Sequence, residues 1–260
     1  MKRLLQFVVG MLAALATSNA LANATAFSVS GNVSAQAGVA AARVVRQGDT
    51  LRAGETVSTG PRSSAVLRFE DGQIAALGAN SRMVIQAFEY DAQAKSGNIL
   101  LNLLQGGMRA VTGLIGRAQP QRVTYRAGNY TIGIRGTDVN IATDGGNAVV
   151  TVTEGLISFS FGTQTITVPA GDGVNAKSDG SFQAAAIATI VEQLQATPQG
   201  RQLLDSIQGL QSIQDAVARA AAGQAGTLTP GEGFASGFVG ATPGPTGPTG
   251  AGGGGSASAR

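Results

Sequence analysis

The sequence has 260 residues, of which 38 are glycine, and a formal net charge of +3. It contains no cysteine, histidine or tryptophan, which excludes zinc sites of the common kind, Ser-His-Asp and Cys-His catalysis, and imidazole acid–base chemistry. Removing Lys2 and Arg3 with the N-terminal segment described below leaves 16 basic against 15 acidic residues, and this balance gives nucleic-acid binding no support. Because the sequence has no cysteine, no disulfide can form, and stability must come from a hydrophobic core.

Residues 1–22 read as a secretory signal peptide. Lys2 and Arg3 precede an apolar run, and Ala20-x-Ala22 provides the small residues of a cleavage site. We therefore expect an exported protein, either periplasmic or secreted. No later stretch approaches ~18 consecutive apolar residues, so we expect no integral membrane span after the signal is removed.

Residues 23–182 are predicted to form one all-β domain. Strict alternation marks AVLRF at 65–69, LISFSF at 156–161 and TQTITV at 163–168 as strands with one buried and one wet face. Glycine turns separate many short segments at intervals of roughly 8 to 12 residues, a pattern typical of a β-roll, solenoid or sandwich. The predicted turns include Gly97, Gly106-Gly107 and Gly155.

Residues 183–223 change to a helical period. Ile187, Ile190, Val191 and Leu194 form one apolar stripe, and Thr197-Pro198 reads as the cap and first residue of a second helix. That helix would present Leu203, Ile207, Leu210, Ile213 and Val217 on one face. The stripes of this helical pair either cover an open edge or end of the β domain or form a homo-oligomer seam. Residues 224–260 are rich in Gly and Pro and are predicted to be a disordered tail.

An ordered series of short motifs resembles the FecR domain family over residues 40–176. The series consists of Gly48-Asp49, Thr59-Gly60, Asp71-Gly72, Asn80-Ser81, Gly133 to Thr137, Glu154-Gly155 and Ala170-Gly171. The resemblance implies an all-β periplasmic module, best known from sensors that relay siderophore occupancy of an outer-membrane transporter to a cytoplasmic sigma factor. The sequence departs from that layout, since we expect neither a membrane span before the β domain nor a β-α-β lobe after it.

Within these motifs, Arg135 stands between Gly133 and Gly136 in an otherwise apolar run. We expect its guanidinium to clasp a carboxylate of Asp71, Asp138 or Glu154, with a ligand or partner contact as the alternative. The structural motif residues are thus Asp71, Gly72, Gly133, Arg135, Gly136, Thr137, Glu154 and Gly155. Asp71-Gly72 is read as a hairpin turn.

Residues 106–130 form the candidate partner surface, because they carry arginines and tyrosines without any acidic residue. The members are Arg109, Arg117, Arg122, Tyr125, Arg126 and Tyr130. Such a segment fits an anionic glycan, a lipid headgroup or an acidic protein; the alternative is a solvated loop. The turn aspartates lack a calcium-loop spacing, and no carboxylate pair stands out as a glycosidase acid and base, so we expect no metal, no cofactor and no enzyme.

Two functions remain open. One is a signalling or adaptor module that binds an envelope receptor or sensor, which the family resemblance favours. The other is a structural or surface protein that binds glycan or itself, which the missing relay parts and the Gly/Pro-rich tail favour.

Overall fold

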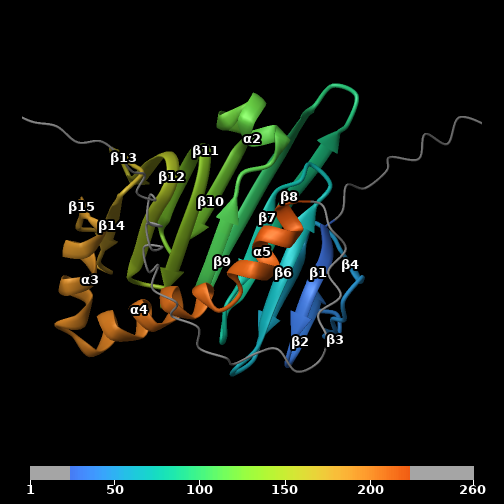
Figure 1. Ribbon diagram of the computed structural model, residues 1–260, viewed down its shortest axis with the longest axis horizontal. Helices are drawn as coiled ribbons and strands as arrows, with labels where there is room; N and C mark the ends of the chain where they lie inside the picture. The colour runs from blue at the N-terminus through green and yellow to red at the C-terminus, as the bar shows by residue number, and fades with distance from the viewer. Residues whose placement is uncertain (1–23, 223–260) are drawn as a thin grey trace, which may run out of the picture. The chain divides into compact units, whose positions relative to one another are not determined.

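The computed structural model describes residues 24–222, and Figure 1 shows how their elements follow one another. The strands are β1 (Ala24–Ser30), β2 (Val33–Ala37), β3 (Arg43–Val44), β4 (Thr50–Leu51), β5 (Glu55–Thr59), β6 (Ser64–Phe69), β7 (Ile74–Leu77), β8 (Arg82–Asp91), β9 (Ser96–Val111), β10 (Val123–Ala127), β11 (Tyr130–Thr143), β12 (Ala148–Phe161), β13 (Gln164–Pro169), β14 (Asp172–Ala176) and β15 (Phe182–Ala186). The helices are α2 (Leu114–Ala118), α3 (Ile187–Gln195), α4 (Pro198–Gln211) and α5 (Gln214–Ala221), with a 3-10 turn η1 at Pro120–Arg122.

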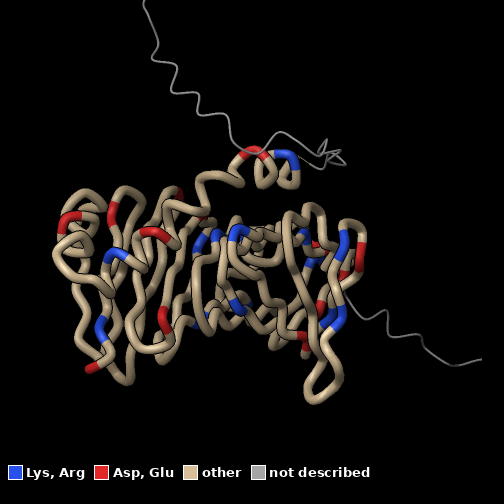
Figure 2. The backbone as a smooth tube through the Cα atoms, turned by 90° about the horizontal axis from the view of Figure 1, so that it is seen from below, with Lys and Arg blue, Asp and Glu red and all other residues tan. Residues whose placement is uncertain are grey.

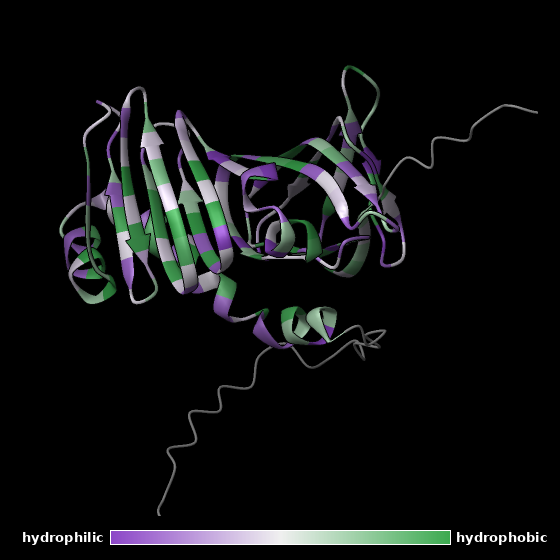
Figure 3. Ribbon diagram, turned by 90° about the horizontal axis from the view of Figure 1, so that it is seen from above, coloured by the Kyte–Doolittle hydropathy of each residue, from purple (hydrophilic) through white to green (hydrophobic). Residues whose placement is uncertain are grey.

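All described strands belong to one sheet. Its main path runs β15-β14-β12-β11-β10-β9-β7-β6-β1-β4, while β13 pairs with β12, and β8, β5, β2 and β3 extend it from β9. Figure 3 shows hydrophobic and hydrophilic residues alternating along the strands. The inner face encloses the main hydrophobic core, in which Leu67, Phe69, Ile157 and Phe159 are buried as their alternation predicted. The all-β prediction is confirmed.

Strands β9 and β11 form a fork that β10 fills. Met108 of β9 lies opposite Ile141 of β11, whereas the first half of β9 pairs in parallel with β10, which in turn pairs with the first half of β11. The crossover from β9 to β10 passes through α2 and η1, because a parallel neighbour cannot be reached by a tight turn. Ile115 of α2 is fully buried in the main core, so α2 closes this side of it.

The turns predicted at Gly97 and Gly106-Gly107 are wrong, because these residues lie inside β9. Gly97 leaves room for a neighbouring strand, since a Cβ there would meet the Glu89 carbonyl oxygen at 2.0 Å. A Cβ on Gly107 would meet the Ser206 carbonyl oxygen of α4 at 2.7 Å. Glycine inside a strand marks such close approaches as well as turns.

The turn predicted at Gly155 is also wrong, because Glu154 and Gly155 lie within β12. The register between β11 and β12 shifts between Arg135 and Asp138, which identifies a β-bulge. Gly136 and Gly155 both have positive φ, and a Cβ on Gly155 would meet the Gly136 carbonyl oxygen at 2.1 Å. The two glycines therefore bring two backbones together within a continuous pair of strands.

Three helices, not a pair, follow the β strands. Thr197 caps α4 by accepting a hydrogen bond from the Gly200 N–H at 3.0 Å, as predicted. The predicted second helix breaks at Ser212 and Ile213, because its two halves pack on different parts of the sheet. Leu203 and Leu204 join Ala142 and Val149 in one outer cluster, whereas Val217 and Ala220 join Val66, Ile74 and Ala76 in another.

The helical stripes are therefore covered by the outer face of this chain's own sheet, and the predicted oligomer seam loses its basis. The proposed signal peptide and the proposed disordered tail lie outside the described residues. Within residues 24–222, no helix has the length and apolarity needed to cross a membrane.

Candidate functional site

The expectation that Arg135 clasps a carboxylate is wrong. Its side chain is exposed and makes no ion pair or hydrogen bond with any described residue. It stands at the β11 bulge, where the following Gly136 turns the backbone away before Asp138. The sequence alone cannot show this, because the bulge reverses which neighbouring residues share a face.

Arg109 occupies the role expected of Arg135. Its Nε donates to Asp138 Oδ1 at 2.9 Å and its Nη2 to Oδ2 at 2.6 Å, a bidentate pair across β9 and β11. The hydrogen bond to Asp138 raises the pKa of Arg109, and the nearby charge of Glu154 adds to this effect. The Arg109 side chain is 18% exposed, so it belongs to the framework and not to the predicted partner surface.

Asp71 lies in the turn between β6 and β7 and is completely buried. Its Oδ1 accepts from the Gln73 N–H at 3.0 Å and its Oδ2 from the Ile115 N–H at 3.3 Å, which ties α2 to this turn. Burial raises the pKa of the Asp71 carboxyl, while these backbone donors oppose the rise. Gly113 must lack a side chain, because a Cβ there would meet Asp71 Oδ2 at 2.4 Å.

Thr137 fixes the strand beyond the bulge. Its N–H donates to Thr112 Oγ1 at 2.8 Å, and the Thr112 hydroxyl donates to the Thr137 carbonyl oxygen at 2.9 Å. This closed pair of hydrogen bonds joins the end of β9 to β11. The Gly-x-Arg-Gly-Thr motif thus provides a bulge and the hydrogen-bonded Thr137, while the side chain of Arg135 is exposed to solvent.

The two tyrosines of the predicted partner surface are wrong assignments, because Tyr125 and Tyr130 are buried. The Tyr125 hydroxyl donates to Gln73 Oε1 at 3.1 Å, and the Tyr130 hydroxyl donates to the Lys177 carbonyl oxygen. Burial raises the pKa of Tyr125, to which the Asp71 charge adds. Tyr130 also stacks on Phe159 with ring centroids 5.1 Å apart. The period of two in VTYRA was the signal for an inward Tyr125.

The remaining predicted arginines are exposed and form no ion pair with a described residue. Arg117 lies in the last turn of α2, Arg122 directly precedes β10, and Arg126 lies within it. Because Thr124 lies opposite Gly133, Arg122 and the exposed Arg135 lie at the same end of the β10–β11 pair. Figure 2 shows that charged residues are few and scattered along a backbone that consists mostly of uncharged residues.

These arginines border a polar surface that we call the bare face. It consists of the outward residues of β10–β13, none of which is buried: Thr124, Arg126, Thr131, Gly133, Arg135, Leu156, Ser158, Ser160, Thr165 and Thr167. The helices α3–α5 pack elsewhere on the outer face of the sheet. The Ser160 and Thr165 hydroxyls are hydrogen-bonded to each other at 3.0 Å. Hydroxyl groups at every second position of LISFSF and TQTITV were the sequence signal for this surface.

A groove of about 480 Å³ crosses the bare face from η1 to β13. Its lining contains no acidic residue and offers hydrogen-bond donors from Gln121, Thr124, Arg135, Ser158 and Thr167. Gly133 keeps the groove open, since a Cβ there would meet Ser158 Oγ at 2.5 Å. A donor-rich groove without carboxylates suits a ligand that carries anionic or carbonyl oxygens.

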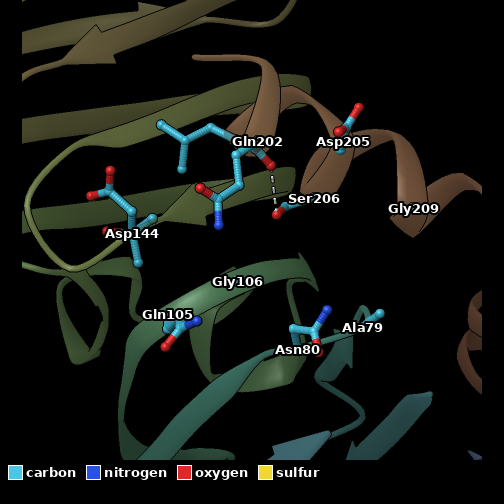
Figure 4. Close-up of a pocket in the computed structure, with 11 residues that line it drawn as sticks. Ala79, Asn80, Gln105, Gly106, Asp144, Gln202, Asp205, Ser206 and Gly209 are labelled. Carbon is cyan, nitrogen blue, oxygen red and sulfur yellow. Dashed lines mark hydrogen bonds between the residues drawn. The ribbon is translucent and has the colours of Figure 1, made fainter. Parts of the chain in front are cut away.

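A second groove, of about 550 Å³, lies between α4 and the turns of the sheet. Figure 4 shows Gln202 and Ser206 of α4 on one side of this groove and Asn80, Gln105 and Gly106 on the other, with Asp144 to one side. The Asp144 carboxylate is already engaged by the Gly146 and Asn147 N–H groups. Among residues 24–222, no three His, Cys, Asp or Glu side chains converge where they could hold a metal ion. The arginine-bordered groove is therefore the better candidate site.

Comparison with known proteins agrees with the motif series. Residues 55–158 match the family model described as FecR protein, and this match confirms the resemblance. The matched segment runs from β5 into β12 and contains the fork, α2 and the bulge. No curated protein is similar enough in sequence to match the chain.

About half of the chain also aligns with two crystal structures of a "putative anti-sigma factor" from Parabacteroides distasonis. The first is 10% identical, with a TM-score of 0.41 over 55% of this chain and 65% of that chain. The second is 11% identical, with a TM-score of 0.42 over 54% of this chain and 72% of that chain. The match thus spans less than two thirds of the first of these proteins.

Proposed function

We propose that this protein is an exported, non-catalytic FecR-domain adaptor that binds another protein of the bacterial cell envelope through the bare face. The FecR domain supports a signalling or regulatory module. The N-terminal Lys2-Arg3, apolar run and Ala20-x-Ala22 support export to the periplasm or beyond.

The observation that carries the proposal is the donor-rich groove, which Arg135 lines, together with the other exposed arginines of the same stretch of chain. Arg117, Arg122, Arg126 and Arg135 make no ion pair with a described residue, and no acidic residue occurs anywhere from 106 to 137. Arginine is enriched at protein interfaces because its planar guanidinium can bond a carboxylate in two places. An acidic partner would supply the charge that this surface lacks.

The alternative is a structural or surface role in glycan binding or self-assembly. Sites for small ligands are lined predominantly by hydrophobic and aromatic side chains, on which the apolar C–H face of a sugar ring can pack. None of the aromatic side chains in residues 24–222 is among the exposed ones. The arginines favour a protein partner or an anionic glycan over a neutral sugar.

The test is site-specific photocrosslinking of the exported protein in its host cells. A photoreactive residue at Arg126 is expected to capture another envelope protein, whereas the same residue at exposed Arg46, in the turn before β4, is expected to capture none. Crosslinks from position 126 only to copies of this chain, or to cell-wall glycan, would replace the adaptor function with the structural one. N-terminal sequencing of the mature protein tests export separately, with cleavage expected after Ala22.

A further inference from the structure

The free edge of β13 lies beside the arginine-bordered groove. On one side β13 pairs with β12, and no described strand pairs with its other side. The segment QTITV contains β-branched residues and no charge, and it ends at Pro169. Edge strands without charged residues are suited to accept a further strand.

The backbone groups available on this edge follow from the ladder. The Ala170 N–H donates to the Gly155 carbonyl oxygen at 3.0 Å, which continues the β12–β13 register. Because hydrogen-bonding positions alternate along an antiparallel strand, Val168, Ile166 and Gln164 point their backbone groups toward β12. Thr165 and Thr167 therefore present their N–H and C=O groups to the free edge, and Pro169 has no N–H to offer.

The edge and the groove share a residue. Thr167 lines the groove with its side chain while its backbone belongs to the edge of β13. A strand added along β13 would continue the sheet, so every second side chain of that strand would stand on the same side as Ser158 and Arg135. The side chains on that side would meet donors and positive charge, without a carboxylate in the groove lining to repel them.

From this arrangement we propose that β13 accepts an extended, acidic segment of the partner protein by strand addition. The backbone of the segment pairs with Thr165 and Thr167, and its alternate Asp or Glu side chains reach over the groove toward Arg135. This inference rests on the proposed function and specifies how the partner is held. A second copy of this chain fits less well, because two copies would bring arginine-rich surfaces together.

The test uses the full mature protein and two fluorescein-labelled decapeptides, one of alternating Glu and Val and one of alternating Gln and Val. Fluorescence anisotropy at low salt is expected to show binding of the Glu peptide and at least roughly tenfold weaker binding of the Gln peptide. Equal affinity for the two peptides would overturn the proposed acidic specificity.

Two matched pairs of variants locate the site. Thr167→Pro removes one N–H from the free edge, whereas Thr167→Ser keeps both this N–H and the hydroxyl that lines the groove, so only the proline variant is expected to weaken Glu-peptide binding by about tenfold. Arg135→Gln is expected to weaken it several-fold, whereas Arg46→Gln, with the same loss of charge elsewhere, is expected to leave it within about twofold. Circular dichroism and thermal unfolding establish that each variant is folded.

Hydrogen exchange provides a readout that a general electrostatic attraction would not give. The Glu peptide is expected to slow exchange of the Thr165 and Thr167 amides, and unchanged exchange there would overturn strand addition. Light scattering that shows a dimer converted to a monomer by Thr167→Pro would assign the edge to a second copy and likewise overturn the proposal. If crosslinks from position 126 persist in Thr167→Pro, the adaptor function stands while this mode of binding fails.

Discussion

Arg109 and Arg135 carry the same charge on the same sheet but differ in what surrounds them. Arg109 and Asp138 are 18% and 11% exposed and share two hydrogen bonds, whereas Arg135 is exposed and has no described partner. Breaking a largely buried pair leaves an uncompensated charge behind, which costs much more than the pair itself contributes.

We therefore expect Asp138→Ala to lower the free energy of unfolding by about 3 kcal/mol. The double variant R109M/D138A should recover part of that loss, because it removes the charge left unpaired. Arg135→Gln should change the free energy of unfolding by less than about 0.5 kcal/mol. Urea denaturation measures the free energy of unfolding of all three variants. A large decrease in Arg135→Gln would support the original prediction that Arg135 pairs with a carboxylate.

Asp71 makes stability depend on pH in a direction opposite to that of a salt-bridged carboxylate. Its pKa in the folded protein is raised by burial above the ordinary 3.8, so the folded state holds its proton more tightly than the unfolded state. The contribution of Asp71 is fully present below pH 3.8 and is lost as pH rises through the raised pKa.

Comparison with Asp71→Asn isolates this effect, because the amide does not ionise. The unfolding free energy of the native protein minus that of Asp71→Asn should fall as pH rises across this window and become constant above it. A pH titration of the urea midpoint of both proteins measures the difference. A difference that rises with pH would mean that the backbone donors of Gln73 and Ile115 lower the pKa of Asp71 by more than burial raises it.

At the level of elements, the bulge between β11 and β12 depends on one contact between backbones. Gly155 has a φ of +76°, and a Cβ there would meet the Gly136 carbonyl oxygen at 2.1 Å. Gly162, in the β12–β13 turn, has a φ of +57° with nothing near its missing side chain. The two glycines thus share positive φ but differ in available space.

Gly162→Ala should therefore cost about 1 kcal/mol for the unfavourable φ alone. Gly155→Ala should cost more than about 3 kcal/mol, because the bulge must also move apart. Thermal unfolding followed by circular dichroism measures both. Equal losses in the two variants would show that the close backbone contact does not contribute.

The strands and helices were predictable wherever periodicity was regular, as in AVLRF, LISFSF and the stripe from Ile187 to Leu194. The sequence could not show where a glycine allows another backbone segment to pack closely against the strand instead of forming a turn, as at Gly97 and Gly107. It also could not assign the partner of Asp138, because a bulge of one residue changes which arginine faces it. The arginines of the bare face were visible as a run without acidic residues, but the inward tyrosines were mistaken for part of it.

For the described molecule as a whole, the three C-terminal helices protect one part of the outer face of the sheet. They cover two apolar clusters, one with Ala142 and Val149 and the other with Val66, Ile74 and Ala76. Removing them would expose both clusters at once, and contiguous exposed apolar surface promotes association.

A chain that ends at Ala186 is therefore expected to form aggregates of increasing size as its concentration rises. Static light scattering of the shortened and full-length proteins at matched concentrations measures this. A shortened chain that stays monomeric would mean that the sheet does not need the helices, and a clean change from dimer to monomer would restore the oligomer seam.

The fork of β9 and β11 also sets an order in which parts of the sheet open. Strands β9 and β11, of 16 and 14 residues, continue through the junction where they pair directly, whereas β10 is a separate strand of 5 residues. Because a short strand can detach without the rest of the sheet, amide exchange should be slowest at the junction of the fork and faster in β10. A ligand that bridges the groove from Thr124 to Thr167 would hold β10 against its neighbours. Binding at the bare face would therefore slow amide exchange in β10.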